Sequence, residues 1–168
     1  GRIPPIAING SGRAPQAASV EQLQGLGLNQ IDYQSPHAVT VPGAVDAWSQ
    51  LLADHGSKDF AELLQPAIRF AEDGYAVSPR VAMDWAANAE KLSACPTAKR
   101  IFLPNGQAPA AGAIHQQPEL ANSLKAIAKD GRDAFYQGTI GDDIVAHLSS
   151  LGSLMTAEDF GQYRAQYV

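Results

Sequence analysis

The sequence predicts a mainly α-helical fold with few short strands, and three observations support this prediction. Alanine, the residue with the highest intrinsic helix propensity, occurs 29 times, against five Phe, five Tyr and two Trp. After Pro42, apolar residues recur every three or four positions between proline, glycine and capping residues, as in amphipathic helices. Apolar residues make up 45% and charged residues 17% of the 168 residues, which excludes disorder and predicts one ordinary domain.

The first quarter of the chain differs in kind from the rest. Residues 1–42 carry four charged side chains, whereas residues 43–168 carry 25. We therefore divide the chain into an extended, weakly charged arm over 1–42 and a helical domain over 43–168, and we expect the arm to lie against another surface. Within the arm, Ile6-Ala7-Ile8 predicts a short strand, and Ser19 followed by Gln22 predicts a capped turn.

Glycine, proline and capping residues predict the first helices of the helical domain. The first helix has one apolar face, formed by Val45, Trp48, Leu51 and Leu52. Gly56 is expected to end this helix in the left-handed conformation. Asp59 is expected to cap the next helix. Pro66 either kinks that helix or opens a new one that ends at Gly74.

The middle of the chain combines one helix with a long loop. Ser78 followed by Pro79 is a typical helix start. The inward face of this helix is formed by Val81, Ala82, Trp85, Ala89 and Leu92. Residues 94–117 contain three prolines and two glycines, so we expect a loop there with a short extended piece at 101–103.

Helical signals resume in the last third of the chain. Pro118 is expected to open a helix that ends at Gly131. Thr139 is expected to cap another helix, which runs to Gly152. Thr156, followed by acidic residues, has the spacing of a final helix start.

Several function classes are excluded by composition and spacing. The chain has 17 acidic and 12 basic residues and no basic cluster longer than Lys99-Arg100, so nucleic acid is not an expected partner. No apolar run approaches the roughly 20 residues that span a membrane. The four histidines and the single Cys95 lack metal-site spacing, so no metal is expected. Gly10-Ser11-Gly12 lacks the third glycine of a dinucleotide loop, so no cofactor is expected.

Arg13 is the one candidate for substrate binding. It lies in the nearly uncharged, glycine-flanked segment 9–15. A guanidinium presented by backbone that can approach a ligand closely is suited to bidentate recognition of a carboxylate. The alternative is an ordinary surface arginine in a loop, and the residues alone leave both interpretations open.

An ordered series of motifs resembles the γ-glutamyltransferase (γ-glutamyltranspeptidase) family, including its cephalosporin-acylase-like members. Each motif is weak by itself, but the series is specific and extends from Asn9 to Tyr163. Its landmarks are residues 10–15, 41–45, Trp48, Leu64, 66–68, Ala71-Glu72, Gly74, 102–104, Gly106, Gln117-Pro118, Leu120-Ala121, Ser123-Leu124, Ile127-Ala128, Gly131, Phe135-Tyr136, Gly138, Ile140, 155–160 and Tyr163.

The resemblance implies the helical portion of an N-terminal-nucleophile hydrolase with the αββα architecture. Such a precursor cleaves itself, and a threonine at the new terminus of the small subunit attacks a γ-glutamyl or related acyl amide. The chain resembles the middle of the large subunit, so it would hold no catalytic residue, would be inactive alone, and would have the small subunit as its partner. Its start lacks an initiator Met, which predicts a processed or excised piece.

One position departs from the family pattern. Aligned on Ala14-Pro15, the family's carboxylate-binding arginine falls on Ser11, and Arg13 stands two residues later. Either Arg13 substitutes from a shifted loop, or the protein belongs to the acylase-like branch with a different acyl group. The resemblance implies a periplasmic or secreted protein, although no signal peptide is visible and a cytoplasmic location stays open. The alternative to an enzyme fragment is a stand-alone helical binding or interaction module without catalysis.

Overall fold

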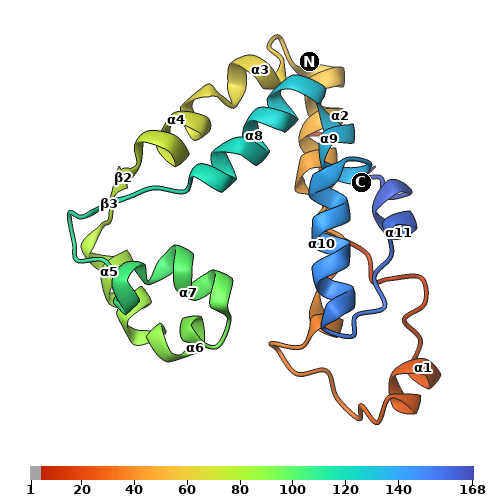
Figure 1. Ribbon diagram of the computed structural model, residues 1–168. Helices are drawn as coiled ribbons and strands as arrows, with labels where there is room; N and C mark the ends of the chain where they lie inside the picture. The colour runs from red at the N-terminus through yellow and green to blue at the C-terminus, as the bar shows by residue number, and fades with distance from the viewer. Residues whose placement is uncertain (1–4) are drawn as a thin grey trace. The chain divides into compact units, whose positions relative to one another are not determined.

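A computed structural model describes residues 5–168, and helices dominate it, as predicted (Figure 1). The chain forms two compact units. The first unit contains the residues up to Leu63 together with Ala126–Val168, and the second contains Leu64–Lys125. The division into an arm over 1–42 and a helical domain over 43–168 stays a prediction.

The elements of the first unit come from both ends of the chain. They are β1 (Ile8–Asn9), α1 (Val20–Gly25), η1 (Pro36–Ala38), α2 (Ala44–His55), α3 (Phe60–Leu63), the end of α8 (Pro118–Asp130), α9 (Arg132–Tyr136), α10 (Thr139–Ser150), α11 (Ala157–Gly161) and β4 (Gln166–Tyr167). The strands β1 and β4 pair antiparallel, with Asn9 opposite Gln166. The predicted strand at 6–8 therefore exists but lies one to two residues later.

The second unit is built from consecutive elements. They are α4 (Gln65–Asp73), β2 (Tyr75–Ala76), α5 (Pro79–Ala87), α6 (Ala89–Ser93), α7 (Pro96–Phe102), η2 (Pro104–Gly106), β3 (Ile114–His115) and most of α8. The strands β2 and β3 pair antiparallel. No helix among residues 5–168 combines the length and the apolar character needed to cross a membrane.

Side-chain caps confirm several of the predicted starts of helices and turns. Ser19 Oγ accepts a hydrogen bond from Gln22 N, and Ser78 Oγ accepts one from Val81 N. Thr156 and Asp159 form a reciprocal capping box at the start of α11. The predicted stop at Gly131 is also confirmed, because this glycine has a φ of 68° that other residues rarely adopt.

Three local predictions are wrong. Gly56 ends α2 with extended backbone (φ −76°, ψ 148°) and not in the left-handed conformation. Gly138, and not Thr139, is the cap of α10. The helix predicted from Ser78 is divided at Asn88, which ends α5 and precedes α6 with a φ of −106° and a ψ of 14° outside the helical range.

The predicted loop over 94–117 is also corrected. Pro96 stands in the first turn of α7, where a missing N–H costs nothing, and the expected extended piece at 101–103 falls on the last turn of this helix. The strand of this region is instead β3, formed by Ile114 and His115. Proline is common both in loops and in the first turn of a helix, and Pro96 marks a helix start.

The core of the first unit is aromatic. Phe160 is fully buried, and Tyr136 and Tyr163 are 2% and 3% exposed. The rings of Tyr136 and Tyr163 stack with centroids 5.9 Å apart. These residues come from α9, α11 and the segment after α11, which lie near α10 in Figure 1. Aromatic packing thus fixes the C-terminal segment of the chain to α9.

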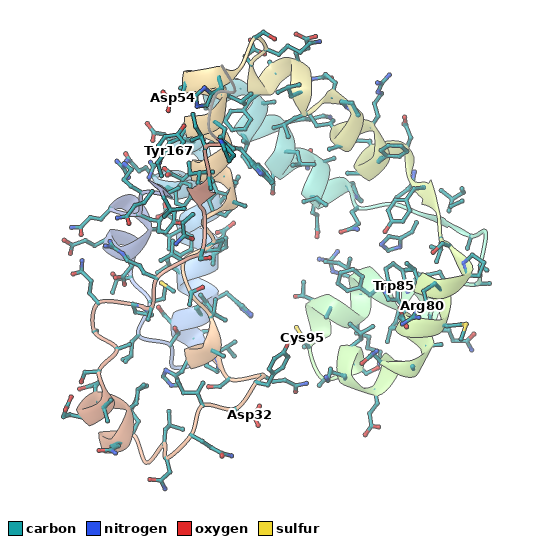
Figure 2. The ribbon with its side chains drawn as sticks, turned by 180° about the vertical axis from the view of Figure 1, so that it is seen from behind. Asp32, Asp54, Arg80, Trp85, Cys95 and Tyr167 are labelled. Atoms are coloured by element: carbon teal, nitrogen blue, oxygen red, sulfur yellow. The ribbon has the colours of Figure 1, made fainter. Side chains whose placement is uncertain are left out.

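The second unit contains a buried histidine within its own aromatic cluster. His115 is 4% exposed, and its ring lies edge-on to Trp85 with centroids 4.8 Å apart and stacks on Phe102 at 6.2 Å. Trp85 is labelled on α5 in Figure 2. Within residues 5–168, Nε2 of His115 has no hydrogen-bond partner. Burial lowers the pKa of His115 below its ordinary value, so the ring is neutral near pH 7.

This buried histidine predicts acid lability of the second unit. Because the pKa of His115 is lower in the folded than in the unfolded state, its contribution to stability is present above the unfolded pKa and is lost as pH falls through the folded pKa. Hydrogen-exchange protection factors of α5 and α7 should therefore fall as pH drops below about 6.5. His115→Phe keeps an aromatic ring without titrating nitrogens and should reduce this loss. Equal acid lability in both proteins would contradict the assignment.

Candidate functional site

The loop that carries Arg13 is held on the first unit from both ends. Before the loop, β1 pairs with β4. Within the loop, Val41 N donates a hydrogen bond of 3.0 Å to Arg13 O. After the loop, Gln16 N donates one of 2.9 Å to Asp159 Oδ1. The loop is therefore positioned by contacts with residues far away in the sequence.

Two glycines permit this loop to approach the segment before α2. A Cβ on Gly12 would lie 1.7 Å from Val41 O. A Cβ on Gly43 would lie 2.1 Å from Gly10 O and 2.2 Å from Tyr163 Oη. Real Cβ contacts are never this short, so glycine is required here by close backbone packing and not by a positive φ.

Tyr163 connects the loop to the C-terminal segment. Its Oη donates a hydrogen bond of 2.9 Å to Ser11 O, and Ser11 N donates one of 2.9 Å to Asn9 Oδ1. Burial raises the pKa of Tyr163, which keeps the hydroxyl protonated as a donor. The conformation of the loop next to Arg13 therefore depends on where Tyr163 lies.

Asp46 in turn fixes the segment that contains Tyr163. This carboxylate of α2 is 1% exposed and forms an ion pair with Arg132 of α9. Ala165 N donates a hydrogen bond of 2.6 Å to Asp46 Oδ2, and Gln50 Nε2 donates one of 2.7 Å to the same oxygen. Arg132 Nη2 also donates one of 2.7 Å to Tyr163 O. We call Asp46, Gln50 and Arg132 the buried clamp.

The electrostatics of the buried clamp favour a charged Asp46. Burial by itself raises the pKa of this carboxyl, but the hydrogen bonds from Ala165, Arg132 and Gln50 outweigh burial and hold the pKa below its ordinary value. Arg132 also lies over the ring of Tyr136, 4.5 Å from the centroid. Burial is the main reason that the pKa of Tyr136 rises to about 12.

Arg13 itself is exposed and lines a small pocket of the first unit. The pocket has a volume of about 140 Å³ and is lined by Asn9, Ser11, Arg13, Tyr163, Arg164 and Gln166. Within residues 5–168, the guanidinium of Arg13 makes no hydrogen bond or ion pair. We call the pocket lined by these six residues the arginine pocket. Its polar lining, which includes two arginines, is suited to an anion.

The carboxylate that acts electrostatically on Arg13 already has other partners. Asp159 is 2% exposed, and its oxygens accept hydrogen bonds from Gln16 N, Thr156 N and Thr156 Oγ1. Burial raises the pKa of Asp159, but these hydrogen bonds and the charge of Arg13 lower it by more, so the carboxyl stays ionised. Asp159 therefore caps α11 and accepts a hydrogen bond from Gln16 after the loop, and it is not among the residues that line the arginine pocket.

The sequence singles out Arg13 as a candidate and gives no sign of the residues that position its loop. Asp46 is acidic but stands alone between apolar residues of a helix, and its partners Arg132 and Ala165 lie 86 and 119 positions away. Its one sequence signal is that a charged residue falls on the buried side of α2. Arg164 lies next to Tyr163 and carried no motif. Within the described residues, no group of three His, Cys, Asp or Glu side chains could hold a metal ion.

The C-terminal strand makes one further polar contact outside the arginine pocket. Tyr167 Oη donates a hydrogen bond of 2.6 Å to Asp54 Oδ2, and Figure 2 shows these two side chains close together. The ring of Tyr167 also lies edge-on to His55. The carboxylate raises the pKa of Tyr167. This contact adds a second attachment of β4 to α2.

Comparisons with known proteins agree over almost the entire chain. A family model described as Gamma-glutamyltranspeptidase matches residues 4–168. The chain is 38% identical over 162 residues to a Glutathione hydrolase-like YwrD proenzyme of Bacillus subtilis, covering 95% of this chain and 30% of that protein. It is 35% identical over 170 residues to an Oxamate amidohydrolase proenzyme of Klebsiella pneumoniae, covering 96% of this chain and 31% of that protein.

Solved structures extend this similarity to the fold. The cephalosporin acylase of Bacillus halodurans superposes with a TM-score of 0.89 at 34% identity, covering 97% of this chain and 32% of that chain. This similarity confirms the predicted fold class, the helical portion of an N-terminal-nucleophile hydrolase, and supports the acylase-like branch. The chain spans about 30% of the length of the curated relatives it matches.

Proposed function

The chain belongs to the gamma-glutamyltranspeptidase family, and from this premise we propose that its parent protein is an amidohydrolase that cleaves a γ-glutamyl or related acyl amide. The observation that carries this proposal is the match of the family to residues 4–168. The relatives at 38% and 35% identity are both proenzymes, one glutathione hydrolase-like and one acting on oxamate. These names favour an enzyme precursor over a stand-alone helical module.

The proposed reaction uses an N-terminal threonine outside this chain. The threonine hydroxyl oxygen attacks the amide carbonyl carbon while the free α-amine takes the hydroxyl proton. The proton passes to the leaving amine as the C–N bond breaks, which leaves the acyl group as an ester on the threonine. Water or an acceptor amine then attacks the ester, releases the acid or a new amide, and restores the hydroxyl. No metal or cofactor is needed for this sequence of steps.

This chain would supply structure and substrate binding to that reaction and no reacting group. The relatives that it matches are proenzymes of which it covers about 30%, so the nucleophile is expected in the part of the parent protein outside this chain. Thr156 already serves as the cap of α11. We propose that the chain is part of the large subunit, that its partner is the small subunit of the same precursor, and that Arg13 contacts the carboxylate of the acyl donor.

A substitution of Arg13 tests the substrate contact. In the full-length protein, Arg13→Ala should weaken donor binding by roughly 1.5 to 3 kcal/mol, because a hydrogen bond to a charged group is lost. The measurement is kcat/KM with a γ-glutamyl anilide. Arg80→Ala is a matched control, since Arg80 is an exposed arginine of the second unit that pairs with Asp84. Unchanged donor kinetics in Arg13→Ala would remove this residue from the site.

The proposed function is tested by assaying two proteins with the same anilide substrate. The full-length protein should release the aniline, and the 168-residue chain alone should not. Turnover by the isolated chain at enzyme-like rates would show that the reacting groups lie within it. No turnover by the full-length protein on any of several acyl anilides would favour a binding module.

A further inference from the structure

Arg164 is the second arginine of the arginine pocket, and its side chain is fixed by the backbone. Arg164 Nη1 donates hydrogen bonds of 2.9 Å to Gly161 O and 2.6 Å to Tyr163 O. A guanidinium has five N–H donors, so these two bonds leave the Nε and Nη2 donors for another acceptor. Arg164 has no ion pair within residues 5–168. A guanidinium that is fixed in place and still has N–H donors available is well suited to bind an anion.

The charge of the arginine pocket is opposite to that of the whole chain. The chain has a formal net charge of −5, yet two arginines and no carboxylate line this pocket. Two like charges at one small pocket repel each other, and an anion bound between them would relieve that repulsion. The neutral lining residues Asn9, Ser11 and Gln166 can add hydrogen bonds to the same ligand.

The pocket size limits the ligand to a small group. A volume of about 140 Å³ is below the roughly 300 Å³ at which pockets for whole small-molecule ligands begin. It fits a carboxylate and the first carbons attached to it, while the rest of a donor would lie outside. The pocket is therefore suited to one end of a substrate.

The two arginines are attached to one rigid support. Tyr163 donates to Ser11 O beside Arg13, and it is also the residue directly before Arg164. The buried clamp holds Tyr163 O and Ala165 N on either side of Arg164. Both guanidinium groups are thus presented by backbone whose position is fixed before any ligand binds, which reduces the entropy cost of binding.

We propose that Arg13 and Arg164 together hold one carboxylate of the acyl donor, and that Arg164 determines the preference for acyl groups with a terminal negative charge. This inference rests on the proposed amidohydrolase function and names its substrate class. Arg164 binds substrate in this account and takes no part in breaking the amide bond. Its removal should therefore change selectivity between acyl groups more than it changes turnover.

The test compares two anilides that differ at one end of the acyl chain. Glutaryl anilide ends in a carboxylate, and valeryl anilide has the same number of carbons and ends in a methyl group. In the full-length protein, Arg164→Ala should lower kcat/KM for glutaryl anilide about ten- to a hundredfold, mainly through KM, and leave valeryl anilide within about twofold. Arg164→Lys should recover part of the loss, and Arg80→Ala should change neither substrate.

Two results would overturn the inference, and both differ from failure of the proposed function. Equal losses on both anilides would assign Arg164 a purely structural role, and an unchanged kcat/KM for both anilides would remove it from the site. If the unmodified protein hydrolyses neither anilide, calorimetry can measure directly how tightly the protein binds glutarate and the neutral glutaramide. Glutarate binding that is lost in Arg164→Ala would then support the pocket and reject the amidohydrolase, whereas no preference for glutarate over glutaramide would reject the pocket.

Discussion

Replacement of Asp46 by alanine is expected to destabilise the first unit by about 3 to 5 kcal/mol, because it leaves the charge of Arg132 buried without its partner. Arg132 has a 14% exposed side chain, so water compensates little of this loss. The substitution also removes the acceptor for Ala165 N and Gln50 Nε2. The C-terminal segment should therefore detach from α2 before the rest of the unit opens.

Hydrogen exchange in the full-length protein measures this effect locally. Amides of α9 and β4 should exchange faster in Asp46→Ala than in the unmodified protein. Asp143→Ala is the matched control, because Asp143 is an exposed carboxylate of α10 and should change protection by less than about 0.5 kcal/mol. Similar protection in both variants would show that the buried clamp contributes nothing.

The same residue predicts a dependence on pH. The pKa of Asp46 is lower in the folded than in the unfolded state, so its contribution to stability is present above the unfolded pKa and is lost as pH falls through the folded pKa. Asp46→Asn removes the titrating group and should flatten the loss of α9 protection at low pH. The stability of this variant near neutral pH should still be lower than that of the unmodified protein.

Gly12→Ala is expected to have the second largest effect, a destabilisation of about 3 kcal/mol. The added Cβ would meet a backbone carbonyl, Val41 O, at 1.7 Å, and a carbonyl oxygen cannot move aside as the end of a flexible side chain can. The loop would have to lift from the segment before α2. The hydrogen bond between Val41 N and Arg13 O should then be lost.

Gly25→Ala is the control for this substitution. Gly25 is the last residue of α1, and a Cβ there meets nothing within 4 Å. This variant should unfold thermally within a degree or two of the unmodified protein or slightly above it, because alanine restricts the unfolded chain. If Gly12→Ala and Gly25→Ala share the same midpoint, the close packing of the Arg13 loop is wrong.

Local signals in the sequence predicted most of the helix boundaries. Ser78 and Thr156 cap the helices that they were expected to cap, and Ser19 caps α1 where a capped turn was expected, because capping depends on residues three positions apart. An ambiguous local signal explains why the prediction of a long loop over 94–117 was wrong. Pro96 can signal either a loop or a helix start, and in the structure it opens α7.

The candidate site was predicted only where one residue carried the signal. Arg13 stands out in a weakly charged segment, whereas Arg164 and Asp46 are ordinary charged residues in sequence. The importance of Asp46 comes from contacts over more than 80 positions, such as that with Arg132, and Arg164 lines one pocket with Asn9, Ser11 and Arg13 from the other end of the chain. No local pattern encodes such contacts, so they became visible only in the structure.

N-terminal sequencing and intact mass measurement of the purified full-length protein test the central claim most directly. The account predicts two chains from one precursor, with this sequence in the larger chain and a threonine as the first residue of the smaller. A single uncleaved chain that hydrolyses acyl anilides, or a smaller chain that begins with a residue lacking a nucleophilic side chain, would contradict it.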